Sequence, residues 1–348
     1  MDSRERYVRA LTFEGPDRAP IMHRTVPGAL RKYGVALDAL YEKYPSDALL
    51  SPATRGLFDF HDKGRGDPFA KGITYDDWGT GWRYTTSDYS GLACKFPLSD
   101  WRAFDSYRPP DPMTGEEGVL YMEEVVRQDG HWHFVCAFGG HLFQRMWFLR
   151  GYMESLVDLQ EDRPELYALR DMLVGWIIRR TERWLETRVV DCVMLGDDFG
   201  SQTALMVRPS VWRKFFKPAY KRIVDAIHAG GAYASFHTDG YTLEIIQDLI
   251  DVGFDELNPQ VTLMDVEELG RRFGGKVCFR ADLDRQSILP WGTPDQVRTH
   301  VQRMFRAFGG FNGGYVGYGS VGTDVPLENI QAMLGAFAAC RYDQDRAA

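Results

Sequence analysis

A histidine and an aspartate two residues apart follow a short apolar stretch in the last third of the chain. Residues 232–236 have the composition of a buried strand, and His237 and Asp239 come directly after it, with Gly240 behind them. Residues two apart in a strand face the same side, so both side chains can reach one pocket. An imidazole and a carboxylate placed in this way could bind a divalent metal or work as an acid/base pair.

A second interpretation needs no chemistry. The pattern predicts a helix over residues 241–252, and Gly240 allows the sharp turn into it. Asp is among the commonest helix N-caps, so Asp239 could only cap that helix while His237 is a core histidine. The rest of the chain has to decide between the two interpretations.

Composition excludes several classes of protein. The chain has 348 residues, of which 44% are hydrophobic, and a formal net charge of −8. Its length suits one large α/β barrel or two ordinary domains. The acidic balance gives no reason to expect nucleic-acid binding, and the sequence shows neither a membrane-spanning run nor a signal peptide. Five scattered cysteines without a CxxC pair are typical of reduced thiols, so we expect a cytoplasmic protein.

Strands and helices alternate along most of the chain. Seven strands are expected, one near His23 and six more at residues 131–138, 189–195, 232–236, 254–258, 276–282 and 313–318. No GxGxxG fingerprint follows the first strand and no Walker-type loop is present, so a nucleotide-binding sheet is not supported. The sequence predicts one domain over residues 1–348, a (β/α)8 TIM-type barrel with its eighth strand hidden in residues 40–118.

Residues 40–118 form an irregular, aromatic-rich insertion. Residues 75–84 have the pattern of a small aromatic hairpin that contains Trp78 and Trp82. A long insertion of this kind could be a lid over an active site or a docking surface for a partner chain, and the sequence does not separate the two.

Polar side chains gather where the predicted strands end, which is the functional face of such a barrel. The residues that share this placement are His23, Arg24, Asp197, Asp198, His237, Asp239, Asn258, Arg280, Asp282, Asp284, Tyr318 and Ser320. We expect Asp198, His237 and Asp239 to be catalytic or metal-binding. The predicted substrate-binding residues are His23, Arg24, Trp78, Arg280, Tyr318 and Ser320.

Several short motifs resemble a known family in their order and spacing. They begin with residues 3–6 (SRER) and 16–20 (PDRAP), and continue with 77–79 (DWG), 149–151 (LRG), 196–200 (GDDFG), 208–210 (RPS), 237–240 (HTDG) and 326–330 (PLENI). Together they resemble the uroporphyrinogen decarboxylase superfamily, which includes zinc-dependent methyltransferases that work with corrinoid proteins. The resemblance covers nearly the whole chain and implies a (β/α)8 barrel with its active site at the strand C-termini.

The methyltransferase branch of this family implies a zinc site made of a His-x-Cys pair and a later cysteine. His237 matches the histidine, while Asp239 and Ser320 stand at or near the positions of the two cysteines. Carboxylate and imidazole make a harder, more Lewis-acidic zinc site than thiolates. Such a site could polarise an ether or amine so that its methyl group passes to a cobalt(I) corrinoid. Asp198 is the candidate third ligand, and an acid/base cluster without metal is the alternative.

The decarboxylase branch implies arginines after the first strand that hold substrate carboxylates. Arg24 lies close to the first of them, but residues 24–28 (RTVPG) replace the family's Arg-Gln-Ala-Gly-Arg, and residues 319–321 (GSV) stand where a late His-Gly is expected. A metal-independent carboxy-lyase acting on a smaller acid, with Arg24 as its carboxylate clamp, is therefore the alternative hypothesis.

The sequence therefore predicts a corrinoid-linked methyltransferase that demethylates a small O- or N-methylated compound. The expected cofactors are zinc and a corrinoid carried by a partner protein. A non-catalytic binding barrel is the third hypothesis, given the missing cysteines. Barrels of this family commonly dimerise, so the resemblance allows a homodimer, which no sequence feature indicates. Neither a nucleic acid nor a membrane is expected as a partner.

Overall fold

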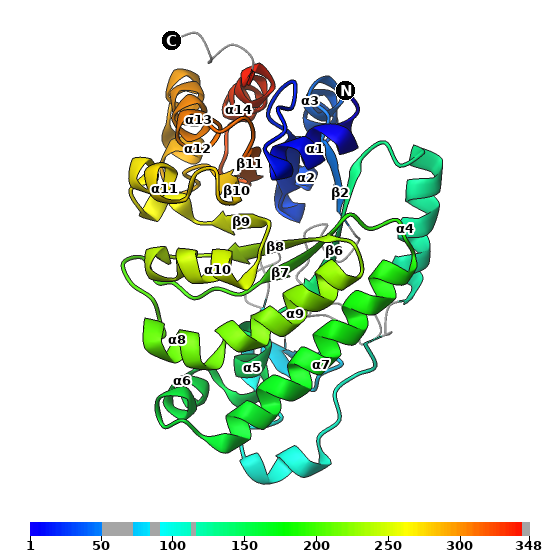
Figure 1. Cartoon of the computed structure of the whole chain (residues 1–348), viewed down its shortest axis with the longest axis vertical. Helices are drawn as coiled ribbons and strands as arrows, with labels where there is room; N and C mark the ends of the chain where they lie inside the picture. The colour runs from blue at the N-terminus through cyan, green and yellow to red at the C-terminus, as the bar shows by residue number, and fades with distance from the viewer. Residues whose placement is uncertain (51–71, 84–90, 113–115, 343–348) are drawn as a thin grey trace.

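The protein is an α/β barrel whose strands are all parallel. A computed structural model describes residues 1–50, 72–83, 91–112 and 116–342 (Figure 1). The main sheet runs in the order β1-β11-β10-β9-β8-β7-β6-β2. Its strands are β1 (Ile21–Thr25), β2 (Ala48–Leu50), β6 (Phe134–Gly140), β7 (Cys192–Gly196), β8 (Tyr233–Thr238), β9 (Glu256–Pro259), β10 (Cys278–Asp282) and β11 (Tyr315–Val321).

The two end strands of this sheet, β1 and β2, come together through Asp47. The main-chain N–H of Asp47 donates to the carbonyl of Ile21 at 2.6 Å, and the Ile21 N–H donates back to the Asp47 carboxylate at 2.8 Å. Asp47 is fully buried and also accepts from Arg6 and Arg18. These bonds close the sheet into a barrel.

Helices cover the outside of the barrel (Figure 1). They are α1 (Ser3–Thr12), α2 (Pro27–Tyr33), α3 (Val35–Lys43), α4 (Glu116–Asp129), α5 (Phe143–Arg150), α6 (Tyr152–Gln160), α7 (Pro164–Glu186), α8 (Pro209–Phe215), α9 (Lys217–Ala229), α10 (Ile246–Val252), α11 (Val266–Phe273), α12 (Ile288–Trp291), α13 (Pro294–Phe308) and α14 (Leu327–Ala339). Short 3₁₀ turns, η2 (Trp101–Ser106), η3 (Leu243–Ile245) and η4 (Val261–Leu263), complete the list.

The predicted barrel is confirmed, strand by strand. Each of the seven expected strands overlaps an observed one, and the eighth is β2, which lies within residues 40–118 as predicted. It was hard to predict because its three residues, Ala48–Leu50, are too few to show a hydrophobic period.

Helix α1 closes the amino-terminal end of the barrel. Arg4 bonds Asp191 just before β7, and the Tyr7 hydroxyl donates to Glu256 on β9 at 2.7 Å. Tyr7 packs in the barrel interior and stacks on Phe134, with ring centroids 4.2 Å apart. Because this end is closed, side chains at the other end of the strands form the open face.

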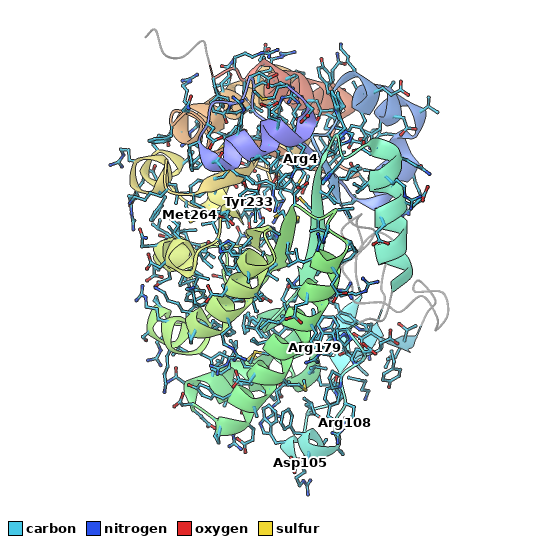
Figure 2. The ribbon with its side chains drawn as sticks, turned by 45° about the vertical axis from the view of Figure 1, so that its right-hand side comes forward. Arg4, Asp105, Arg108, Arg179, Tyr233 and Met264 are labelled. Atoms are coloured by element: carbon cyan, nitrogen blue, oxygen red, sulfur yellow. The ribbon has the colours of Figure 1, made fainter. Side chains whose placement is uncertain are left out.

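The insertion is a packed unit joined to helix α5. The predicted aromatic hairpin is confirmed as β3 (Ile73–Tyr75) and β4 (Gly81–Arg83), which pair antiparallel, and β5 (Leu92–Lys95) adds a third strand. Buried Asp76 holds this sheet together, accepting from the Trp82 indole at 3.1 Å and pairing with buried Arg145 of α5 at 3.0 Å. In Figure 2, Asp105 and Arg108 of this region lie at the opposite end of the molecule from Arg4.

The structure describes only part of residues 40–118, the segment for which a lid is predicted. Part of it, residues 51–71, 84–90 and 113–115, lies outside the described residues. Among those described, Trp78 and Trp82 are 7% and 2% exposed, so their rings are core rather than pocket lining. No helix in the described parts of the chain is long and apolar enough to cross a membrane.

Candidate functional site

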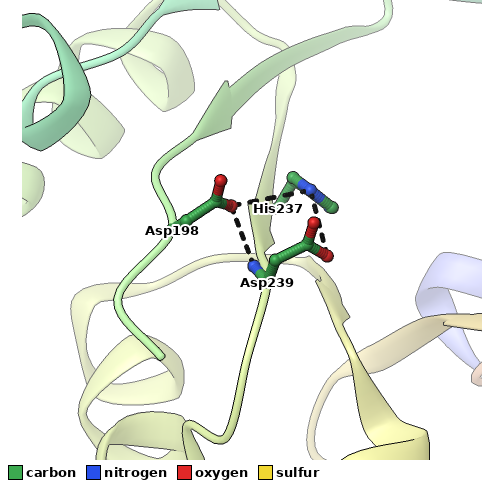
Figure 3. Close-up of side chains that lie close together, drawn as sticks. All are labelled: Asp198, His237 and Asp239. Carbon is green, nitrogen blue, oxygen red and sulfur yellow. Dashed lines mark hydrogen bonds and ion pairs between the residues drawn. The ribbon is translucent and has the colours of Figure 1, made fainter. Parts of the chain in front are cut away.

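Three side chains meet at the carboxyl ends of β7 and β8. Asp198 follows β7, His237 is the fifth residue of β8, and Asp239 follows that strand directly. His237 Nε2 lies 3.6 Å from Asp239 Oδ1 and 3.9 Å from Asp198 Oδ1. One ligand atom from each residue lies within 4.8 Å of the others (Figure 3). The predicted trio is therefore one cluster.

A pair of glycines brings the two loops of the cluster together. Gly240 has a φ of +85°, and a Cβ there would lie 2.1 Å from the main chain of Gly200. The close approach lets Gly200 N donate to the Asp239 carbonyl at 3.1 Å. Asp239 N in turn donates to Asp198 Oδ1 at 2.9 Å. Glycine at these positions thus fixes Asp198 against Asp239.

The capping interpretation of Asp239 does not hold. The expected helix at residue 241 starts later: Thr242 caps the 3₁₀ turn η3, and α10 begins at Ile246. Asp239 therefore caps neither element, and its carboxylate faces His237 and Arg285.

Asn258 fixes the tautomer of His237. Its Nδ2 donates to the carbonyl of Arg280, which can only accept, so its Oδ1 faces His237 Nδ1 at 2.7 Å. Nδ1 must then carry a proton, so in the neutral imidazole that a metal ligand requires it is the Nε2 lone pair that faces the two carboxylates. This arrangement is typical of metal-binding histidines, whose other nitrogen is held by a hydrogen bond.

The other two members of the cluster are held in the same way. Gln144 of α5 donates to Asp198 Oδ2 at 2.9 Å, and Arg285 pairs with Asp239 Oδ2 at 2.7 Å. Each candidate ligand therefore has a hydrogen-bonding partner behind it, as ligands of metal sites do. Gln144 and Arg285 were missed by the sequence interpretation. Arg285 lies three residues after the strand end at Asp282, a usable signal, whereas nothing local marks Gln144.

The spacing of the cluster fits a small divalent cation. Separations of 3.6 and 3.9 Å are too long for hydrogen bonds but close to the roughly 3.4 Å between neighbouring ligands of tetrahedral zinc. Two carboxylates and one imidazole would supply three ligands and leave a fourth position open, the pattern of catalytic rather than structural zinc.

The pKa values of the carboxylates diverge. Burial raises the pKa of Asp198, and the neighbouring Asp239 carboxylate raises it further. For Asp239 burial acts in the same direction, but His237 and Arg285 outweigh it and lower the pKa. Burial also raises the pKa of Asp282 to about 6, although Arg285 opposes this. Such divergence in one site is characteristic of active sites.

The predicted substrate-binding residues separate into two groups. Arg24, Tyr318 and Ser320 lie at the barrel mouth: Arg24 is in register with Ser320, and its charge acts on Asp239. Tyr318, two residues before Ser320 on β11, is in register with Asp282. Arg24 and Ser320 are placed to line the site, whereas the ring of Tyr318 is 4% exposed and packs on Arg280, whose Cζ lies 4.8 Å from the ring centroid.

The structure does not bring Arg280 or Trp78 to the cluster. Arg280 is 2% exposed and its Nε bonds Glu256 at 2.9 Å in the barrel interior, below the site. Trp78 packs against Trp176 and under the Arg145 guanidinium. Neither side chain lines the mouth, because Arg280 lies one layer below Asp282 in the barrel interior and Trp78 packs against α5 and α7.

His23 also lies away from the cluster. Its ring stacks on Tyr41 of α3 at 4.0 Å between centroids, and its Nε2 bonds the Tyr44 carbonyl at 2.8 Å. The neighbouring Met22 packs into the barrel interior, so alternation turns His23 outward.

Half-buried His23 is expected to lower the stability of the protein in mild acid. Burial lowers its pKa to about 4, against about 6.5 in the unfolded chain. Between these two values the unfolded state binds a proton that the folded state does not bind. The free energy of unfolding therefore falls by up to about 3 kcal/mol as the pH falls from 6.5 to 4. Urea unfolding of His23→Gln with a chelator present should show a smaller drop across this window. An unchanged drop would contradict the prediction.

Comparison with known proteins identifies the family. Residues 81–339 match the uroporphyrinogen decarboxylase (URO-D) family, which is most of the chain. The chain belongs to the uroporphyrinogen decarboxylase family. No curated protein matches the sequence significantly.

Two solved structures illustrate the shared fold. A methyltransferase from Methanosarcina mazei aligns with a TM-score of 0.69 at 15% identity, over 97% of this chain and 99% of that one. A B12-independent methionine synthase from Shewanella sp. W3-18-1 aligns with a TM-score of 0.52 at 10% identity, over 89% of this chain and 86% of that one. At these identities the similarity concerns the fold, and the URO-D family match supports an enzyme of this superfamily.

Proposed function

We propose that this member of the uroporphyrinogen decarboxylase family is a methyltransferase. Its substrate would be a small O- or N-methylated compound, and its methyl acceptor a corrinoid carried by a partner protein. The observation that carries the proposal is the Asp198–His237–Asp239 cluster, with ligand atoms within 4.8 Å at the open end of the barrel. The fold shared with a methyltransferase supports it.

Zinc is the cation that we propose for this cluster, with His237 Nε2 and one oxygen each from Asp198 and Asp239 as ligands. Bound there, it would supply Lewis acidity to the ether oxygen or amine nitrogen that carries the methyl group. Asn258, Gln144 and Arg285 would keep the three ligands in place.

The carboxylates also determine which donor atoms suit the site. Oxygen and nitrogen ligands make a harder site than the thiolates implied for the zinc-dependent branch, and hard sites prefer oxygen or nitrogen donors. A methyl ether or methylamine fits this preference better than a thioether. If Asp198 is not a ligand, its raised pKa suits it to donate a proton to the departing oxygen or nitrogen.

A carboxy-lyase is the second candidate, and Arg24 is the observation in its favour. Arg24 is the last residue but one of β1, at the barrel mouth, where it could hold a substrate carboxylate. Arg285 is a second guanidinium among the described residues of the mouth, and part of its hydrogen-bonding capacity goes to Asp239 and Asp282. A reaction that requires several carboxylates to be bound is therefore less well supported.

A methyl-transfer assay tests the proposal. Zinc-loaded protein is incubated with O- and N-methylated compounds and chemically reduced cobalamin, and methylation is followed by loss of the cobalt(I) absorbance. We expect transfer from at least one methyl ether or methylamine, with a loss of at least about 100-fold in Asp239→Asn. Release of CO₂ from carboxylated substrates without methyl transfer, abolished by Arg24→Ala, would instead establish the lyase.

A further inference from the structure

We propose that Arg285 is a specificity-determining residue that, with Arg24, selects a methyl donor carrying one negative charge. The inference rests on the proposed function, because it concerns the substrate class of the same site. It names a residue outside the cluster of candidate ligands.

The Arg285 side chain links the ends of two strands, β8 and β10, at the barrel mouth. It lies in the loop between β10 and α12, and its guanidinium spans two carboxylates. One nitrogen lies 2.7 Å from Asp239 Oδ2 and another 3.2 Å from Asp282 Oδ2. A guanidinium has five N–H donors, and these two ion pairs do not use all of them. The Arg285 side chain is 30% exposed. Arg285 is thus anchored and still accessible from the mouth.

Arg24 acts on the same carboxylate from another strand. It stands on β1 in register with Ser320 of β11, and Tyr318 of the same strand is in register with Asp282 of β10. The charge of Arg24 lowers the pKa of Asp239, as that of Arg285 does. Arg24 and Arg285 therefore both belong to the barrel mouth, one on its β1 side and the other on its β10 side.

The charge balance of the mouth favours an anion. Arg24 and Arg285 face three carboxylates, those of Asp198, Asp239 and Asp282. A divalent cation on the cluster would leave this group of side chains with one net positive charge. A substrate with a single negative charge would neutralise it, whereas an ammonium group would be repelled.

The chemistry of the selected donor follows from these charges. A guanidinium binds a carboxylate through charge-assisted hydrogen bonds, so the expected donor is a methyl ether that also carries a carboxylate. Within the proposed class of O- and N-methylated compounds, this places anionic ethers ahead of methylated ammonium ions.

Three probes of similar size and different charge test the inference. Calorimetric titration of zinc-loaded protein is made with 4-methoxybenzoate, 4-methoxybenzamide and 4-methoxybenzylammonium, without corrinoid. The variant is Arg285→Gln, which keeps a hydrogen-bond donor for Asp239. The matched control is Arg303→Gln, which removes an exposed arginine paired with Glu267 on the surface.

We expect the benzoate to bind at least about tenfold tighter than the benzamide, with this preference lost in Arg285→Gln and kept in Arg303→Gln. Equal binding of benzoate and benzamide, preference for the ammonium, no binding of any probe at millimolar concentration, or a preference that survives in Arg285→Gln would overturn the inference. Because turnover is not measured, charge preference without methyl transfer refutes only the proposed function. Transfer without charge preference refutes only the role of Arg285.

Discussion

Removing the imidazole of His237 is expected to abolish tight metal binding. Purified protein supplied with zinc should retain about one ion per chain, and His237→Ala should lower zinc affinity by at least about 100-fold. The physical reason is that Nε2 supplies one of three ligand atoms, at 3.6 and 3.9 Å from the two carboxylates. Metal analysis after dialysis measures the stoichiometry, and titration with cobalt(II) as a coloured substitute measures the affinity.

A second histidine provides the control for this experiment. His228→Ala removes an imidazole that pairs with Asp255 on the surface, at 2.9 Å, and should leave zinc binding unchanged. Wild-type protein that binds no zinc, or His237→Ala that binds it as tightly as the wild type, would contradict the metal site. The cluster would then be an acid/base group.

Deleting the buried guanidinium of Arg280 is expected to destabilise the barrel strongly. Arg280 and Glu256 are 2% and 3% exposed in the barrel interior, with 2.9 Å between Nε and Oε1. Burial opposes the charge on Arg280, but Glu256 outweighs it and the pKa of Arg280 is raised. Arg280→Ala leaves the Glu256 carboxylate buried without its counter-charge, which costs about 3–5 kcal/mol. Urea unfolding at neutral pH measures the loss.

An exposed pair of the same type gives the comparison. Arg303 binds Glu267 through two nitrogens at 2.7 and 2.6 Å, with both side chains about half exposed. Arg303→Ala should therefore cost no more than about 1 kcal/mol. If Arg280→Ala is no more destabilising than Arg303→Ala, the buried pair does not stabilise the fold in the way we argue.

Strand signals in the sequence were enough to predict the barrel. Runs such as residues 192–196 and 233–236 are apolar because strands of a parallel barrel are covered on both faces. The order of elements then leaves few topologies, and the barrel places every strand end on one face. For this reason the trio at Asp198, His237 and Asp239 could be predicted to meet before any coordinates were considered.

The structure differs from the sequence interpretation where side-chain direction matters. His23 and Arg280 both belong to predicted strands with polar ends, but His23 points outward to Tyr41 and Arg280 lies one layer below the mouth. A shift of one residue in a strand reverses the facing side, and a shift of two changes the layer. Predicted strand ends are uncertain by more than this, so sequence alone does not separate lining residues from core residues.

The sequence by itself determined the fold, the face that carries the site and the trio of candidate ligands, because local apolar runs and their spacing specify parallel strands. Tertiary structure decided which groups hold those ligands. Gln144 comes from α5, Asn258 from β9 and Arg285 from the loop after β10, and each reaches the trio across 20 or more residues of sequence. Such partners are set by the closure of the barrel, since hydrogen bonds between distant segments follow from packing and leave no local pattern.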